Sequence, residues 1–264
     1  MRKAVEALIS RLFRDPRYVP IGKVDRFGRE KIAFVEVCAV LSPTGEPRGQ
    51  YLLNQKYELG GRPDGERPYG AESLLDYYQA QLTNRQQSSL TKEDHVQMRE
   101  ESWQYYVRRN FHFLMEDFER ARQDAEHNLG LWELIDRYGM EDPDRWEFLR
   151  WWPWIERDRA VATALGDVER GDLEAAAMEL YRAAKAIDHF AVAHEAPYAM
   201  EPEAQRDLCQ TMRDHICALT EVLRKEHDMP ICLEEQVDLA MERGDAGEVE
   251  RLREEMIRRV MEEG

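Results

Sequence analysis

The stretch that decides the fold is a short acidic corner, "GDLEAA", at residues 171–176. Apolar residues at helical spacing lie before and after it, and Asp172 can accept a hydrogen bond from the first turn of the helix that follows. The same phrase returns as "EDFERA" at residues 116–121 and as "GDAGEV" at residues 244–249. In each copy the residue after the aspartate is apolar and can pack between two helices. The pattern predicts three helical hairpins.

Helical periodicity and helix-breaking residues extend this pattern over most of the chain. Thr91 is a good N-cap, and prolines such as Pro143 and Pro202 suit the first turn of a helix. The corners recur at unequal intervals, both longer than the repeat of about 34 residues in tetratricopeptide proteins. We therefore expect a short, irregular, tetratricopeptide-like array. The predicted helices are 2–14, 71–83, 91–114, 117–138, 143–170, 173–190, 202–226, 233–243 and 246–262.

The N-terminal region has the residue pattern of β-strands. Between residues 18 and 59, three runs rich in β-branched and aromatic residues are separated by turn residues around Gly28 and Ser42. They predict a small antiparallel β-meander, which needs other elements to pack on. The expected fold class is mainly α, with the meander followed by αα-hairpins. The expected segments are residues 1–60, 61–200 and 201–264.

Composition restricts the function. The 264 residues include 53 acidic and 37 basic side chains, a net charge of -16, which disfavours general binding to nucleic acids or anionic membranes. The N-terminus is too charged for a signal peptide, and we expect no membrane span because no long apolar run occurs. Four cysteines without a CxxC pair are typical of a reducing compartment. We expect a cytoplasmic location.

The third corner lies in "LEEQVDLAMERGDAGEVERLREEMIRRV", residues 233–260. This stretch resembles the UVR motif, the C-terminal helical hairpin of the excision-repair proteins UvrB and UvrC. The resemblance implies an association element that packs on another copy. Ala246 stands where the motif usually has an aromatic residue. The matching positions are Leu233, Ala240, Asp245, Leu252, Arg253 and Ile257.

A second resemblance covers most of the chain. The phrases "GRPDGERPYGAESLLDYY", residues 61–78, and "EDFERARQDAEHNLGLWELIDRY", residues 116–138, resemble a bacterial family of uncharacterised UVR-motif proteins. Members of that family join a β-meander, the first of these phrases, tetratricopeptide-like hairpins and a C-terminal UVR hairpin. The resemblance implies an architecture for this chain and no catalytic residues.

The glycine-rich segment 61–70 has two interpretations. Its backbone amides and two guanidiniums, beside a helix that would begin near Ala71, could bind an anion. Alternatively it is a strand-to-helix connection whose arginines pair with nearby acids. In the helix that follows, two carboxylates at i and i+4 could serve acid–base or metal chemistry, or form a solvated face. The candidate ligand-binding residues are Arg62, Asp64, Arg67, Glu72 and Asp76.

Two other clusters also leave alternatives open. The aromatic residues of "RWEFLRWWPWIERDR", residues 145–159, could stack on a ring ligand or fill the core, and Pro153 should kink or restart the helix there. The late histidines and cysteines lack metal-binding spacings such as HExxH. We predict no catalytic residue, metal or cofactor.

The leading hypothesis is a non-enzymatic protein–protein interaction module, an adaptor whose UVR-like tail binds another protein or a second copy of the chain. The first alternative is a small-ligand or anion-binding protein, or an enzyme, with its site around Gly61–Gly70. The second is an accessory factor of nucleic-acid repair. The candidate partner-binding residues are Leu233, Val237, Ala240, Val249, Leu252, Arg253 and Met256.

Overall fold

The computed structural model describes residues 3–14, 17–26, 29–41, 47–84, 89–139, 143–193 and 202–263. As predicted, the chain is mainly helical. It divides into two compact units, one of Glu6–Arg159 and one of Met1–Val5 with Ala160–Gly264. The boundaries expected after residues 60 and 200 lie inside these units.

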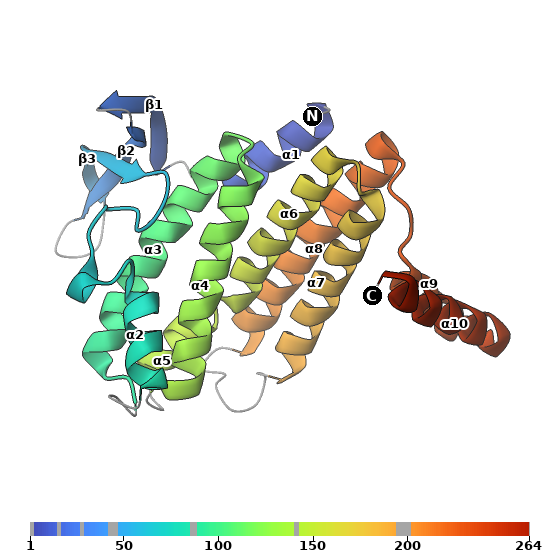
Figure 1. Cartoon of the computed structure of the whole chain (residues 1–264). Helices are drawn as coiled ribbons and strands as arrows, with labels where there is room; N and C mark the ends of the chain where they lie inside the picture. The colour runs from blue at the N-terminus through green and yellow to red at the C-terminus, as the bar shows by residue number, and fades with distance from the viewer. Residues whose placement is uncertain are drawn as a thin grey trace. The chain divides into compact units, whose positions relative to one another are not determined.

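Within the described residues, the elements follow one another with short connections (Figure 1). The strands are β1 (Tyr18–Arg26), β2 (Arg29–Leu41) and β3 (Pro47–Glu58). The first helices are α1 (Lys3–Phe13), the 3-10 turn η1 (Pro68–Gly70), α2 (Leu74–Thr83), α3 (Lys92–Leu114), α4 (Phe118–Tyr138), α5 (Pro143–Leu149) and α6 (Trp152–Arg170). Both α1 and α6 run across the division between the two units. The remaining helices are α7 (Leu173–Ala193), α8 (Pro202–His227), α9 (Leu233–Glu242) and α10 (Ala246–Glu263).

The three strands form an antiparallel sheet in the order β1-β2-β3. Phe34, in the central strand, is fully buried, and its ring centroid lies 4.9 Å from that of Phe111 in α3. Tyr18 and Tyr57 complete the cluster around it. Since α3 supplies the apolar cover that a small sheet lacks by itself, residues 1–60 do not separate from the helices that follow.

The three acidic corners have the same local geometry. In each, the aspartate side chain accepts a hydrogen bond from the backbone N–H three residues later, which caps the second helix as predicted. The aspartate's own N–H donates to the carbonyl five residues earlier, which closes the first helix. The capping distances are 3.3 Å for Asp117, 3.0 Å for Asp172 and 3.1 Å for Asp245.

The corners differ in the two residues that flank the aspartate. The preceding residue has positive φ in all three, and it is Gly171 or Gly244 in two corners but Glu116, with φ 58°, in the first. The following residue is buried only at Phe118. The expectation that Ala246 packs between its helices is wrong, because this exposed methyl group is too small to reach across the hairpin.

The predicted helix 143–170 is two helices, α5 and α6. Pro153 lies in the first turn of α6, where its missing N–H has no helical acceptor to lose. The interruption turns the aromatic side chains in different directions. Trp146 and Phe148 are buried, whereas Trp151 is 42% exposed.

Candidate functional site

Arg108 ties the segment 61–70 to the helices. Its Nη1 donates to the carbonyl oxygens of Glu58 at 2.9 Å and Gly61 at 2.8 Å. Its Nε and Nη2 donate to the two carboxylate oxygens of Asp124 at 2.9 and 2.6 Å. Both side chains are buried. The connection between β3 and α2 is therefore held by a paired charge on α3 and α4.

The anion at the N-terminus of α2 is supplied by the chain itself. The carboxylate of Glu101, which is fully buried, accepts hydrogen bonds from the backbone N–H of Leu74 at 2.9 Å and of Leu75 at 3.3 Å. Arg62 Nε lies 3.2 Å from the same carboxylate, and His127 Nε2 lies 2.9 Å from it. A carboxylate in this position satisfies the first amides of the helix and its dipole. An external anion would have to displace it.

The five candidate ligand-binding residues all have partners inside the chain. Arg62 Nη2 lies 3.2 Å from Asp64 Oδ2, which also accepts a hydrogen bond from Gln104 at 3.0 Å. Arg67 pairs with Glu72 at the surface. Ser73 Oγ donates to Asp76 at 2.6 Å.

The prediction that Glu72 and Asp76 share a helical face is wrong. Ser73 caps α2, so the helix begins at Leu74, and Glu72 lies outside it. Since the two carboxylates do not stand at i and i+4 of one helix, they form no acid–base or metal pair.

The apolar candidates of the C-terminal hairpin form its own core. Val237, Ala240 and Leu252 are buried between α9 and α10. Leu233, Val249 and Met256 are half-buried against them. These six residues hold the hairpin together, and Arg253 is the one candidate of the seven whose side chain is exposed.

The outer face of the hairpin is hollowed and partly apolar. A groove of about 650 Å³ lies beside the corner at Asp245 and carries the exposed side chains of Met241, 46% exposed, and Ile257, 61% exposed. Arg253 also lines it and contacts Met241 Sδ at 3.7 Å. Among the residues that the structure describes, no carboxylate lies within ion-pair distance of Arg253.

Ion pairs attach the hairpin to α7 and α8. Arg182 pairs with Glu234, and Arg224 pairs with Glu235. Lys185 Nζ lies 2.8 Å from Asp238 Oδ2, which also accepts a hydrogen bond from the Tyr181 hydroxyl. The hydrogen bond from Lys185 and that from Tyr181 lower the pKa of Asp238. These contacts occupy the surface of the hairpin that faces α7 and α8, and Met241 and Arg253 border both that surface and the groove. A partner would meet the hairpin along the groove.

Three thiols whose side chains the structure describes have raised pKa values. Burial raises the pKa of Cys209 to about 11, and loss of solvent around the thiol also raises the pKa of buried Cys232 and of the more exposed Cys217. Within the described ranges, no three His, Cys, Asp or Glu side chains gather in a way that could hold a metal ion. In the same ranges, no helix combines the length and the apolar character that crossing a membrane requires.

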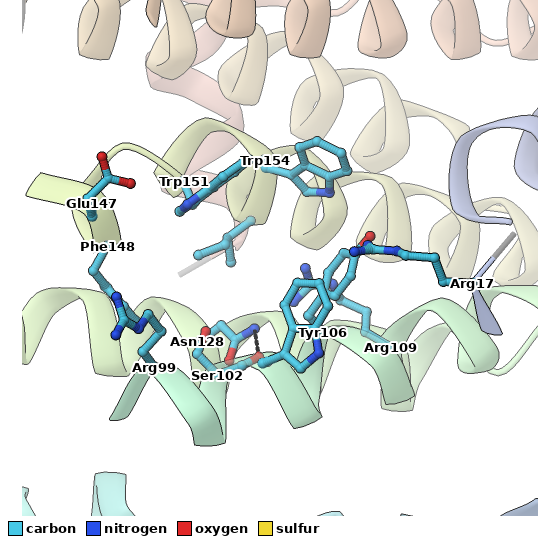
Figure 2. A pocket seen from close by; sticks show the side chains of 12 residues that line it. Arg17, Arg99, Ser102, Tyr106, Arg109, Asn128, Glu147, Phe148, Trp151 and Trp154 are labelled. Atoms are coloured by element: carbon cyan, nitrogen blue, oxygen red, sulfur yellow. Dashed lines mark hydrogen bonds between the residues drawn. The ribbon is translucent and has the colours of Figure 1, made fainter. Parts of the chain in front are cut away.

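One cavity lies beside the aromatic stretch 145–159, for which the sequence left a ring ligand and core filling open. It has a volume of about 380 Å³ and is lined by Trp103 and Tyr106 of α3 together with Trp151 and Trp154. Figure 2 shows Tyr106, Trp151 and Trp154 around it. A sequence signal for it exists on α3. Arg99, Trp103 and Tyr106 stand at i, i+4 and i+7, which places them on one helical face.

In comparisons with protein-family models, curated proteins and solved structures, nothing matches this chain.

Proposed function

We propose that the chain is a non-enzymatic interaction module that associates through the outer face of the α9–α10 hairpin. The observation that carries this proposal is the pairing of exposed Met241 and Ile257 with Arg253 around one groove. Exposed apolar side chains grouped beside a charge that lacks a carboxylate are typical of protein interfaces. The proposal also includes the architecture of the chain. It takes the α9–α10 hairpin as UVR-like, the helical hairpins as tetratricopeptide-like, and the N-terminal meander as an element that packs on the helices.

A second copy of the chain is the partner that this face fits best. On α10, Val249, Arg253 and Ile257 are spaced at i, i+4 and i+8, which forms one stripe. Glu250 and Glu254 line the same groove. When two such helices pair antiparallel about a two-fold axis that passes between Glu250 and Arg253, Arg253 of each helix faces Glu250 of the other. The face is therefore complementary to itself in charge as well as in apolar character.

The two alternative functions have less support. A small-ligand or anion site at 61–70 is disfavoured, since the five candidate residues have internal partners and Glu101 holds the helix N-terminus. A role in nucleic-acid repair is disfavoured because a net charge of -16 repels the phosphates of a nucleic acid.

Sedimentation equilibrium of the full chain tests self-association. Ile257→Asp places a charge in the apolar seam and Arg253→Glu sets like charges against each other, so each should weaken association at least about tenfold. Val192→Asp is the matched control, because Val192 is 75% exposed on α7 and outside the groove. The triple variant Arg253→Glu, Glu250→Arg, Glu254→Arg reverses the charges and should restore pairing.

Two results would contradict this proposal. A chain that stays monomeric at high concentration excludes pairing between copies, and capture of other proteins by the wild type against Ile257→Asp then tests the broader adaptor role. Equal weakening by Ile257→Asp and Val192→Asp would remove the hairpin face from the interface.

A further inference from the structure

The cavity beside Trp151 has the construction of a small-molecule site. It lies wholly within the unit Glu6–Arg159. In Figure 2, Trp151 and Trp154 face the side chains of α3 and α4 across the cavity. Aromatic walls with a few polar groups, in a volume of this size, are typical of ligand pockets. The lining residues are Arg17, Arg99, Ser102, Trp103, Tyr106, Arg109, Asn128, Glu147, Phe148, Trp151, Trp154 and Ile155.

Aromatic rings line the cavity, and a planar molecule could stack on them. The ring centroids of Trp103 and Tyr106 are 5.0 Å apart, and those of Trp151 and Trp154 are 5.9 Å apart. Trp103 and Trp151 are 44% and 42% exposed, although large aromatic side chains are usually buried when they serve only the core. The guanidiniums of Arg17 and Arg150 lie 5.1 and 5.3 Å from the centroids of the Trp103 and Trp151 rings, and a planar ring can stack on the aromatic surface that stays exposed.

Three buried polar atoms of the lining have no partner among the described residues. They are Arg109 Nη1, Trp154 Nε1 and Asn128 Oδ1. Arg109 and Asn128 are each 1% exposed, so these groups cannot turn to bulk solvent. Their other atoms are engaged, because Arg109 pairs with Asp158 at 2.7 Å and Asn128 donates to the Ser102 carbonyl at 3.2 Å. Buried polar atoms without a hydrogen bond are destabilising, and a ligand that reaches them would remove that cost.

The balance of these groups favours an anion. Two of the three buried atoms are N–H donors, and Arg99 adds an exposed guanidinium that has no ion pair in the part of the chain that the structure describes. Glu147 is the carboxylate of the lining, and Arg150 donates to it at 3.3 Å. The guanidinium of Arg109 lies 5.5 Å from the ring centroid of Tyr106, which adds a cation–π contact to the wall. The site thus presents more donors than acceptors to a ligand.

We propose that this pocket binds a small planar aromatic molecule that carries one anionic group. The rings of Trp151 and Trp103 stack on the ligand, and Arg99 binds its carboxylate or phosphate. Arg109 Nη1, further along α3, donates a hydrogen bond to a second polar atom of the ligand. Asn128 Oδ1 accepts a hydrogen bond from an N–H or O–H on the ring. An aromatic carboxylate and a nucleoside monophosphate share this chemistry.

Isothermal titration calorimetry with the full chain tests the ligand class. The two anionic probes are 2-naphthoate and AMP, and their neutral counterparts are 2-naphthamide and adenosine. We expect at least one anion to bind about tenfold more tightly than its neutral counterpart, because only the anion pairs with Arg99. Cyclohexanecarboxylate, which has the charge without the flat ring, should not bind. The preferred probe distinguishes a carboxylate ligand from a phosphate ligand.

Two variants locate the binding. Arg99→Gln should weaken the anionic probe about tenfold and leave its neutral counterpart unchanged, whereas Trp151→Leu should weaken both. Both replaced side chains are exposed, so the fold should persist, which thermal unfolding followed by circular dichroism checks. Arg137→Gln, at an exposed arginine of α4 outside the lining, is the matched control.

Three results would each overturn the inference: no binding of either anion at millimolar concentration, equal affinity for an anion and its neutral counterpart, or equal effects of Arg99→Gln and Arg137→Gln. The hairpin and the pocket belong to different units, so loss of either proposal leaves the other standing.

Discussion

Ion pairs join helices in both units of the chain, and the two sets differ in their exposure to solvent. In the unit Glu6–Arg159, Arg108 and Asp124 have side chains that are 3% and 4% exposed. In the other unit, Arg182 and Glu234 have side chains that are 57% and 24% exposed. The buried guanidinium also satisfies two backbone carbonyls, whereas Arg182 hydrogen-bonds to Glu234 at the surface.

The difference teaches that the free energy lost when one charge of an ion pair is removed depends on how well the remaining charge can be hydrated. A buried charge left alone has lost its water and cannot recover it. An exposed charge left alone is hydrated at once. All six tryptophans lie between residues 103 and 154, so tryptophan fluorescence reports on the first unit. Far-ultraviolet circular dichroism follows both.

The largest expected effect is that of Asp124→Asn. The substitution leaves the buried Arg108 guanidinium without a counter-charge, and the free energy of unfolding should fall by about 3–5 kcal/mol. Urea unfolding followed by tryptophan fluorescence measures it. The double variant Arg108→Met, Asp124→Leu removes both charges but also the donor to the carbonyls of Glu58 and Gly61, so it should recover only part of the loss. A loss of less than about 1 kcal/mol in Asp124→Asn, the size expected at an exposed pair, would contradict the prediction.

A smaller effect concerns pH, through His112 beside the same pair. Burial lowers the pKa of His112 to about 4, and Asp124 only partly opposes it. Between this value and the ordinary pKa of about 6.5, the unfolded chain binds a proton that the folded chain does not, so stability falls as pH falls. From pH 7 to pH 5 this group should remove about 2 kcal/mol from the free energy of unfolding.

The variant His112→Asn isolates that contribution. Its urea midpoint, followed by tryptophan fluorescence, should change less between pH 7 and pH 5 than that of the wild type. The slope with pH is the readout, whatever the absolute stability of the variant. Equal slopes for the two proteins would mean that His112 takes up its proton in the folded state as readily as in the unfolded one.

The smallest expected effect is that of Arg182→Gln at the exposed pair. The free energy of unfolding of its unit should fall by less than about 1 kcal/mol, and the difference from the wild type should shrink at high salt. Urea unfolding followed by circular dichroism at low and high ionic strength measures the loss of free energy and its dependence on salt. Tryptophan fluorescence should show no change in the first unit. A loss as large as that of Asp124→Asn would erase the distinction between the two sets of ion pairs.

The positions of the helices and corners were largely predictable. Asp117, Asp172 and Asp245 cap helices through hydrogen bonds that span three residues, so the neighbouring sequence contains both partners. The start of α2 was misplaced by three residues at Ala71 for the opposite reason. Ser73 and Glu101 together receive the first amides of that helix, and Glu101 stands more than twenty residues further along the chain.

The sequence by itself therefore determined the helical class, the corners and the acidic surface, since each depends on contacts between near neighbours or on composition alone. Only the tertiary structure decided which charges are buried together and which aromatic rings surround a cavity. Arg108 meets carbonyls of residues 58 and 61 and a carboxylate at 124, and the pocket unites side chains from Arg17 to Ile155. These groups are distant in sequence and become neighbours only when the helices pack. Periodicity and residue spacing describe local structure and do not show how the helices pack.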